Sequence, residues 1–257
     1  MTTQRTAVIT GSASGIGAAI RSRLEADGLR VIGIDLAGQE IDADLSTPEG
    51  RTSAVEAVLT LTDGRIDALV PGAGLGPQVP DRGLIVAVNY FGAMGVLEGL
   101  FPALQAGESP AAVLICSNSI SMTPMPDPTL LDLMVAGDED AAREASVGMH
   151  GPTVYAMTKR ALGLAARQRV QAWGEAGVRL NLVAPGPIST PLLQGTRDDA
   201  ELGQYVDLLP IPIGRVGEPS EIAGPVAFLL GPDSANVHGS VLFADGGSDA
   251  LFRPDHV

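Results

Sequence analysis

Several residue types are scarce in this sequence, and each shortage excludes a class of protein. One cysteine among 257 residues, Cys116, excludes an internal disulfide and a paired-cysteine metal site, so no metal is expected. Sixteen basic residues against thirty acidic ones disfavour nucleic acid and anionic membranes as partners, because both bind basic surfaces. No apolar run reaches the roughly 18 residues of a membrane span, and no signal peptide is expected before the first apolar strand. These absences indicate a globular cytoplasmic protein.

Aromatic residues make up only 4% of the chain, while 32 glycines and an apolar share of 45% favour close packing of helices on a sheet. Short apolar runs bounded by Gly, Asp or Pro alternate with helical stretches. We expect strands at 6–10, 30–35, 66–71, 111–117, 178–183 and 240–244, and helices at 16–27, 48–61, 83–105, 153–175 and 219–230. This alternation predicts an α/β fold: one doubly wound, Rossmann-type domain over residues 1–257, with helices on both faces of a parallel sheet.

One stretch, residues 119–152, breaks the alternation, because it is far longer than the usual connection of a few residues. It includes an acidic helical piece at 138–145. Five of the seven methionines lie in or just after it: Met122, Met125, Met134, Met149 and Met157. Unbranched thioethers adapt to varied apolar surfaces. The stretch is interpreted either as a mobile lid over a bulky hydrophobic substrate, or as a packed subdomain or oligomer contact.

A glycine-rich loop connects the first expected strand to the first helix. It reads TGSASGIG at 10–17 and supplies Gly11, Ser14, Gly15, Ile16 and Gly17. Glycines allow the backbone to approach a pyrophosphate, which is stabilised at the positive end of the helix. The pattern therefore predicts a dinucleotide site.

An acidic residue, Asp35, ends the second expected strand, eighteen positions after Gly17. A carboxylate there accepts hydrogen bonds from the adenosine ribose hydroxyls and repels a 2′-phosphate. The glycine-rich loop contains no Arg or Lys, and none follows Asp35 directly. NAD is therefore favoured over NADP as the cofactor.

The lone lysine of the chain, Lys159, follows Tyr155 by four residues, and the other fifteen basic residues are arginine. Residues four apart share one face of a helix. A nearby ammonium lowers the pKa of a tyrosine, whose ordinary value is near 10. The pair thus predicts a phenol that donates a proton to a carbonyl, or removes one from an alcohol, while NAD exchanges a hydride.

A serine at the end of the strand 111–117, Ser117, is expected to polarise the substrate oxygen, because ligands bind at this edge of such sheets. Ser119 is the competing candidate. Cys116 is interpreted as a small buried side chain and not as a nucleophile.

With these residues in view, the chain resembles the short-chain dehydrogenase/reductase family over essentially its whole length. The resemblance implies that Ser117, Tyr155 and Lys159 are catalytic and that Asn89 is the fourth catalytic residue, which holds a relay water. It also implies further cofactor contacts at Asp44, Leu45, Ala73, Gly74, Pro185, Gly186, Ile188 and Thr190, beside those of the tyrosine and the lysine. One departure is Pro71-Gly72, where most relatives carry two asparagines that brace the central sheet.

Within this family the chain resembles bacterial hydroxysteroid dehydrogenases that are also carbonyl reductases. The likeness rests on segments 43–51, 73–78, 88–93 and 172–181 and on the long insertion. It implies a homodimer, with a tetramer as the alternative. The expected activity is reversible NAD-dependent oxidation of a secondary alcohol to a ketone on a bulky hydrophobic substrate. Alternatives are a monoterpenoid, cyclic or xenobiotic substrate, or a non-catalytic module that binds NAD.

Overall fold

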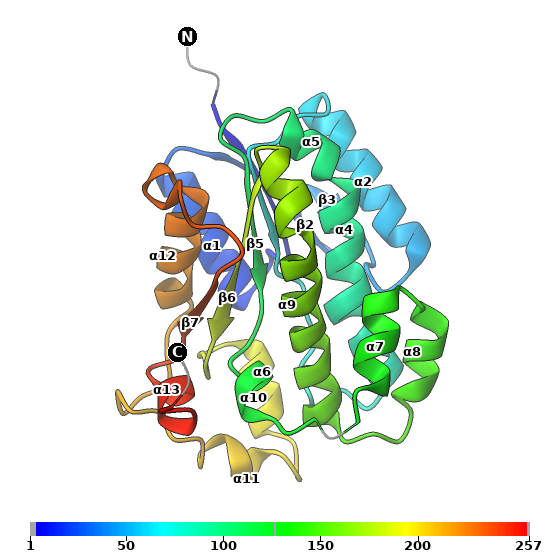
Figure 1. Ribbon diagram of the computed structural model, residues 1–257, viewed down its shortest axis with the longest axis vertical. Coiled ribbons are helices and arrows are strands. Elements are labelled where there is room, and N and C mark those ends of the chain that lie inside the picture. Colours follow the sequence, from blue (N-terminus) through cyan, green and yellow to red (C-terminus); the bar gives the residue numbers. More distant parts are fainter. Residues whose placement is uncertain (1–3, 126, 256–257) are drawn as a thin grey trace.

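The computed structural model describes residues 4–125 and 127–255, so Pro126 in the expected insertion lies outside it. The described residues form one seven-stranded parallel sheet (Figure 1). Its spatial order is β3 (Ile41–Asp42), β2 (Arg30–Asp35), β1 (Thr6–Thr10), β4 (Ala68–Pro71), β5 (Ala111–Ile115), β6 (Arg179–Pro185) and β7 (Val241–Ala244). The predicted α/β class and parallel sheet are confirmed.

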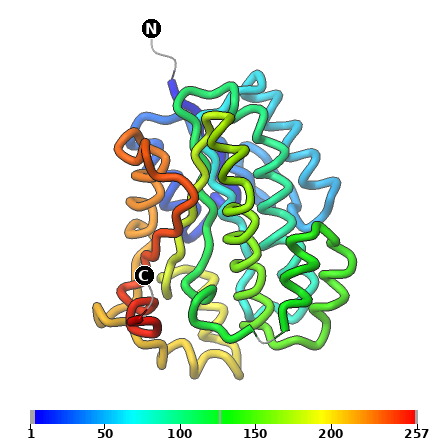
Figure 2. The backbone as a smooth tube through the Cα atoms, viewed as in Figure 1, coloured from blue at the N-terminus to red at the C-terminus, as the bar shows by residue number. Residues whose placement is uncertain are grey.

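Helices cover both faces of the sheet (Figures 1 and 2). Each face has its own apolar core. On one face α1 (Gly15–Ala26) packs against α12 (Pro219–Leu230). The other face carries α2 (Pro48–Thr62), α4 (Ala93–Gly99), α5 (Phe101–Gln105) and α9 (Gly151–Glu175). Because all strands are parallel, their carboxyl ends meet at one edge, and the loops that leave this edge can form a common site.

The helix expected over 83–105 is divided into four pieces: α3 (Arg82–Val86), η1 (Ala87–Gly92), α4 and α5. η1 is a π-helix, a geometry that often marks functional sites. Leu100 leaves the regular helical geometry (φ −95°, ψ 0°) before Pro102, which lacks a backbone N–H. Residues 82–99 are thus helical without a break, as predicted, and the helix is interrupted at Leu100 before α5.

Other boundaries also differ from the prediction. The strand expected from residue 66 begins at Ala68, because the Ile66 N–H donates to Ala103 O at 3.1 Å and not to a neighbouring strand. The two-residue strand β3 was not predicted. Short helices also occupy segments without an expected element: α6 (Ser119–Met122), α7 (Thr129–Ala136), α10 (Pro191–Arg197), α11 (Gly203–Val206), η2 (Pro232–Ser234) and α13 (Ser248–Phe252).

The insertion forms two packed helices, α7 and α8 (Glu139–Ala145), that lie against α9 and α3. Met134 and Met157 are 0% and 1% exposed, so both belong to the core. The Arg51 guanidinium on α2 donates to the Glu139 carboxylate on α8 at 2.6 Å. Of the two interpretations of the insertion, this part of it therefore fits the packed subdomain.

Within the described residues, no helix combines the length and apolar character needed to cross a bilayer.

We predict that Arg51→Ala lowers the free energy of unfolding by about 2 kcal/mol, because it leaves a largely buried carboxylate without its charged donor. Urea unfolding measures the loss. Arg23→Ala is the matched control, because it breaks an exposed ion pair with Asp27 within one helix and costs less than about 0.5 kcal/mol. Equal losses in the two variants would show that the contact between α2 and α8 contributes no special stability.

Candidate active site

A cavity of about 880 Å³ opens at the carboxyl edge of the sheet. The glycine-rich loop and the ends of β2, β4, β5 and β6 line it, together with α9 and α10. Every cofactor residue expected from the sequence lies along this cavity, as do Ser117, Tyr155 and Lys159. Asn89 does not.

The glycine-rich loop brings backbone into direct contact with backbone. A Cβ at Gly11, where φ is +73°, would lie 2.7 Å from Ala73 Cα. A Cβ at Gly17 would lie 2.0 Å from Gly11 O. These glycines bring the amino end of α1 to the cavity wall, a geometry suited to a pyrophosphate.

The Asp35 carboxylate is held at the end of β2 by two backbone donors. Ala13 N donates to Oδ2 at 3.0 Å, and Leu36 N donates to Oδ1 at 2.8 Å. Each oxygen keeps acceptor capacity toward the cavity. This arrangement fits hydrogen bonds from a pair of vicinal ribose hydroxyls.

Thr10 braces the strand ends beside Pro71-Gly72, where the family resemblance led us to expect two bracing asparagines. Its hydroxyl oxygen accepts from Gly72 N and from Ala73 N, each at 3.0 Å. The brace therefore comes from β1 and not from the residues at 71 and 72. Gly74 next to it lies against the site, because a Cβ there would be in van der Waals contact with Asn89 Oδ1 at 3.4 Å and with Lys159 Nζ at 3.5 Å.

Tyr155 and Lys159 lie on one face of α9, with the ammonium nitrogen 5.8 Å from the centre of the phenol ring. Lys159 is 5% exposed, and Nζ donates to Ile115 O at 3.0 Å. The Ser117 side chain acts on the Tyr155 phenol and lowers its pKa, against the larger effect of burial. Ser119 N donates to Ser117 Oγ at 3.2 Å, so the backbone of the competing serine orients Ser117.

Burial dominates the protonation of this pair. Desolvation raises the pKa of Tyr155 to about 12, although the Ser117 side chain lowers it. Desolvation also lowers the pKa of Lys159 to about 8. The prediction that the ammonium lowers the pKa of Tyr155 is therefore wrong for this state, because burial favours the neutral form of both groups.

Asn89 lies behind the cavity wall, on the π-helix η1, and is 0% exposed. Its Oδ1 accepts from Leu75 N at 2.7 Å, and its Nδ2 donates to Leu75 O at 3.0 Å. The carboxamide thus fixes the loop that follows β4, and it lies near the site without lining it.

The segment after β6 closes the cavity opposite the glycine-rich loop. Thr190 Oγ1 donates to Ile188 O at 3.1 Å and accepts from Leu193 N at 3.2 Å, which caps α10. A Cβ at Gly15 would lie 3.2 Å from Thr190 Cγ2. The two loops therefore meet across the cofactor groove.

Asp44 and Leu45 also line the cavity, in the segment between β3 and α2. Hydrogen bonds from Ser46 lower the pKa of the Asp44 carboxyl.

The other half of the cavity is largely apolar, and the sequence reasoning missed most of its wall. The wall is formed by side chains from α3, η1, the segment 192–209 and the carboxyl-terminal helix: Leu84, Val88, Leu192, Leu193, Leu202, Tyr205, Val206, Leu209 and Phe252. Met122 contributes from the insertion. The unusually long connection between β6 and α12, rich in leucine, is the signal that could have indicated this wall.

Comparison with known proteins places this site in a family. A family model described as enoyl-(acyl carrier protein) reductase matches residues 141–249. The chain is 46% identical over 250 residues to 3-alpha-hydroxysteroid dehydrogenase/carbonyl reductase of Comamonas testosteroni, covering 96% of this chain and 97% of that protein. A tropinone reductase homologue of Arabidopsis thaliana is 28% identical over 267 residues, covering 94% of this chain and 78% of the relative.

A solved structure agrees with the sequence comparison. The 3-alpha-hydroxysteroid dehydrogenase of Pseudomonas sp. B-0831, complexed with NADH, superposes with a TM-score of 0.96 at 46% identity, covering 98% of this chain and 100% of that one. Identity at this level over nearly the whole length establishes the relationship: the chain belongs to the short-chain dehydrogenase/reductase family and is an oxidoreductase.

Proposed function

We propose that the protein reversibly oxidises a secondary alcohol to a ketone on a bulky hydrophobic substrate, with NAD as the cofactor. One observation carries the proposal: Ser117, Tyr155 and Lys159 line the same cavity as the glycine-rich loop and Asp35, and an apolar wall faces them. The similar proteins named above are a hydroxysteroid dehydrogenase/carbonyl reductase and an NADH complex. They support a hydroxysteroid-like alcohol as the substrate.

The residues present fit NAD. The glycines leave room for the pyrophosphate where a Cβ would strike backbone, and Asp35 keeps acceptor capacity for the ribose. When bound, NAD supplies the carbon that accepts or returns the hydride. Ile188 and Thr190 would hold the nicotinamide end, and Asp44 and Leu45 would flank the adenine. Repulsion from Asp35 opposes NADP.

The proton is handled by Tyr155 and Ser117. With its pKa near 12, Tyr155 is a phenol at neutral pH, which is the form that donates a proton to a ketone oxygen. Oxidation requires the reverse transfer, from the alcohol to the phenolate. The Ser117 hydroxyl polarises the substrate oxygen. Lys159, with its pKa near 8, is charged at neutral pH, so its ammonium offsets the negative charge that develops on Tyr155 as the phenol gives up its proton.

We further propose that the whole chain acts as one cytoplasmic dehydrogenase domain and assembles as a homodimer, as the family resemblance implies. β7 is an edge strand of the sheet, and it leaves Leu242 38% exposed, while Phe228 on α12 is 45% exposed. Both support a contact with a second copy.

Tyr155→Phe should reduce turnover at least about 100-fold and leave NADH binding intact, because only the proton donor is lost. Absorbance of NADH, followed over steroid, monoterpenoid and simple cyclic alcohols, measures turnover and identifies the substrate class. Tyr90→Phe is the matched control: burial also raises the pKa of Tyr90 to about 12, but this tyrosine lies in the core. A Tyr155→Phe variant with near-normal turnover would overturn the proposed role. If the wild-type protein bound NADH but oxidised none of these alcohols, the substrate proposal would fail.

Ser117→Ala should lower kcat about 100-fold, as loss of one donor to a developing oxyanion does. Ser119→Ala should leave kcat within about twofold, because it removes only Oγ and keeps the N–H that orients Ser117. Steady-state kinetics on the best alcohol of the screen distinguishes the two serines. The reverse order of effects would assign the substrate contact to Ser119.

The buried lysine makes stability depend on pH. Between pH 8 and 10.5 the unfolded chain holds a proton on Lys159 that the folded chain has released, so the free energy of unfolding rises with pH across this window. Lys159→Met removes the effect. Its gain in Tm over the wild type should be largest at pH 8 and should shrink toward pH 10. Scanning calorimetry tests this, with exposed Arg160→Met as the control, whose Tm difference should not vary with pH. A constant difference for Lys159→Met would contradict the assigned pKa.

A further inference from the structure

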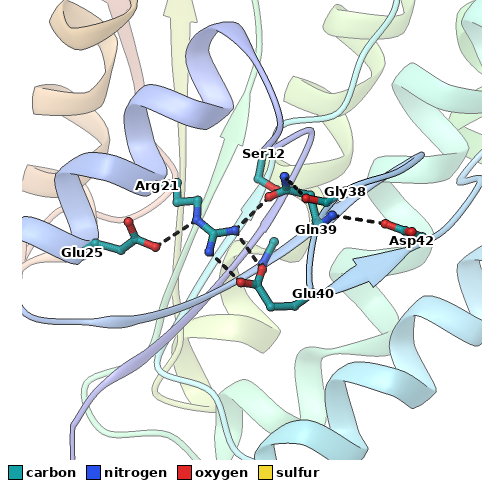
Figure 3. Close-up of polar contacts among 8 residues, drawn as sticks. Ser12, Arg21, Glu25, Gly38, Gln39, Glu40 and Asp42 are labelled. Carbon is teal, nitrogen blue, oxygen red and sulfur yellow. Dashed lines mark hydrogen bonds and ion pairs between the residues drawn. The ribbon is translucent and has the colours of Figure 1, made fainter.

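A polar network lies beneath the loop that carries Asp35, and the proposed reaction does not use it (Figure 3). We define the Asp35 loop as residues 35–40, which connect β2 to β3. Its middle residues, Leu36, Ala37 and Gly38, are exposed, so this loop depends on contacts at its ends for a fixed position. Those contacts come from Gln39 and Glu40.

Glu40 is held by a forked ion pair with Arg21 on α1. Arg21 Nη2 donates to Oε1 at 2.6 Å, and Nη1 donates to Oε2 at 2.8 Å. Gly33 N on β2 also donates to Oε2 at 2.8 Å. Glu25, one turn along α1, accepts from Arg21 Nε at 2.9 Å. The guanidinium thus joins the helix that begins at the glycine-rich loop to the end of the Asp35 loop.

Gln39 extends the network into the glycine-rich loop itself. Its Oε1 accepts from Ser12 Oγ and from Arg21 Nη1, each at 2.8 Å. Ser12 is 2% exposed, and its neighbour Ala13 donates its N–H to Asp35. Both walls of the adenosine end of the groove are therefore tied to one guanidinium.

The polar network packs closely against the backbone of β2. A Cβ at Gly33 would lie 2.3 Å from Ser12 Oγ, 2.5 Å from Gln39 Oε1 and 2.8 Å from Arg21 Nη1. The network therefore lies directly on the backbone of the strand that ends in Asp35. Arg21 also lowers the pKa of Glu40 to about 2, so the carboxylate keeps its charge over the physiological range.

We propose that Arg21 and Glu40 are positioning residues for the adenosine half of the cofactor: the pair fixes the Asp35 loop against the glycine-rich loop, so that the Asp35 carboxylate is presented to the ribose before the cofactor binds. The inference rests on the proposed NAD function. Neither residue lines the cavity, so both act through Asp35 and the loop. A preordered loop removes an ordering cost from binding, and its effect therefore falls on affinity.

The test compares binding by Arg21→Gln and Glu40→Gln. Each removes one charge of the pair and keeps a polar side chain: Glu40→Gln retains the length of the side chain, and Arg21→Gln shortens it. We expect the Kd for NADH, measured by fluorescence titration, to rise about fivefold in each variant. This ratio corresponds to the largest free energies that exposed, well-oriented ion pairs contribute. Because the effect belongs to the adenosine half, calorimetry with ADP-ribose should give the same ratio. The double variant should bind no more weakly than the single ones.

Arg23→Gln is the matched control. It breaks an ion pair on the same helix, with Asp27, that does not touch the Asp35 loop, and it should leave both dissociation constants unchanged. In steady-state kinetics, Arg21→Gln and Glu40→Gln should raise KM for NAD and leave kcat unaltered. A lowered Tm with unaltered Kd would show a merely structural pair and overturn the proposal, as would an equal loss of affinity in Arg23→Gln.

The wild-type titration separates this inference from the function on which it rests. If the wild-type protein binds neither NADH nor ADP-ribose, the proposed function fails and the inference fails with it. If the wild-type protein binds both, and the two variants bind them equally well, only the positioning role is overturned.

Discussion

Lys159 is buried between α9 and the carboxyl end of β5, where its ammonium nitrogen donates to the Ile115 carbonyl at 3.0 Å. A cation in this place has exchanged most of its hydration for one carbonyl and a nearby phenol ring. The rest of the site depends on this contact. It fixes the register of α9 against the sheet, and thereby holds Tyr155 within reach of Ser117 at the end of the neighbouring segment.

Holding the pair in this way carries a cost in stability. Lowering the pKa of a lysine by burial means that the folded protein disfavours the charged form that the unfolded chain prefers. A methionine of similar length would suit the position better for folding alone. The lysine supplies a charge beside the catalytic tyrosine at the expense of folding stability, which is the usual trade-off between stability and activity. The rest of the chain offsets the cost with two apolar cores, one on each face of the sheet.

Local patterns were sufficient to predict the fold class, the glycine-rich loop and Asp35, whereas the other expected contacts along the groove came from the family resemblance. The glycine-rich loop, Asp35 and the spacing between Tyr155 and Lys159 each express a requirement met within a few residues of chain. Features that depend on distant partners were not predicted. The apolar wall at 192–209 takes its role from folding back over the site. The shift in the pKa of Tyr155 depends on burial by the whole fold.

The methionines of the insertion also show that composition alone does not predict where a side chain lies. They indicated an apolar environment, which is correct, but composition does not distinguish a wall of the cavity from the interior of the protein. Met122 lies along the cavity, while Met134 is in the core. The difference is set by how α7 packs on α9. The division of the helix over 83–105 could in part have been read from Pro102, whereas the π-helical turn at Asn89 has no comparable signal.

The packing of α1 on α12 has a consequence for how the chain is made. Ile20 and Leu24 on α1 share one apolar cluster with Ile222 and Val226 on α12, although about two hundred residues separate them. The ribosome therefore releases the helix of the glycine-rich loop long before it synthesises the partner that covers it. Until residues 219–230 emerge, the nascent chain presents an uncovered apolar helix face, the kind of surface on which aggregation begins and chaperones bind. A message truncated before residue 219 would therefore yield the glycine-rich loop and α1 without α12, the helix that covers the apolar face of α1.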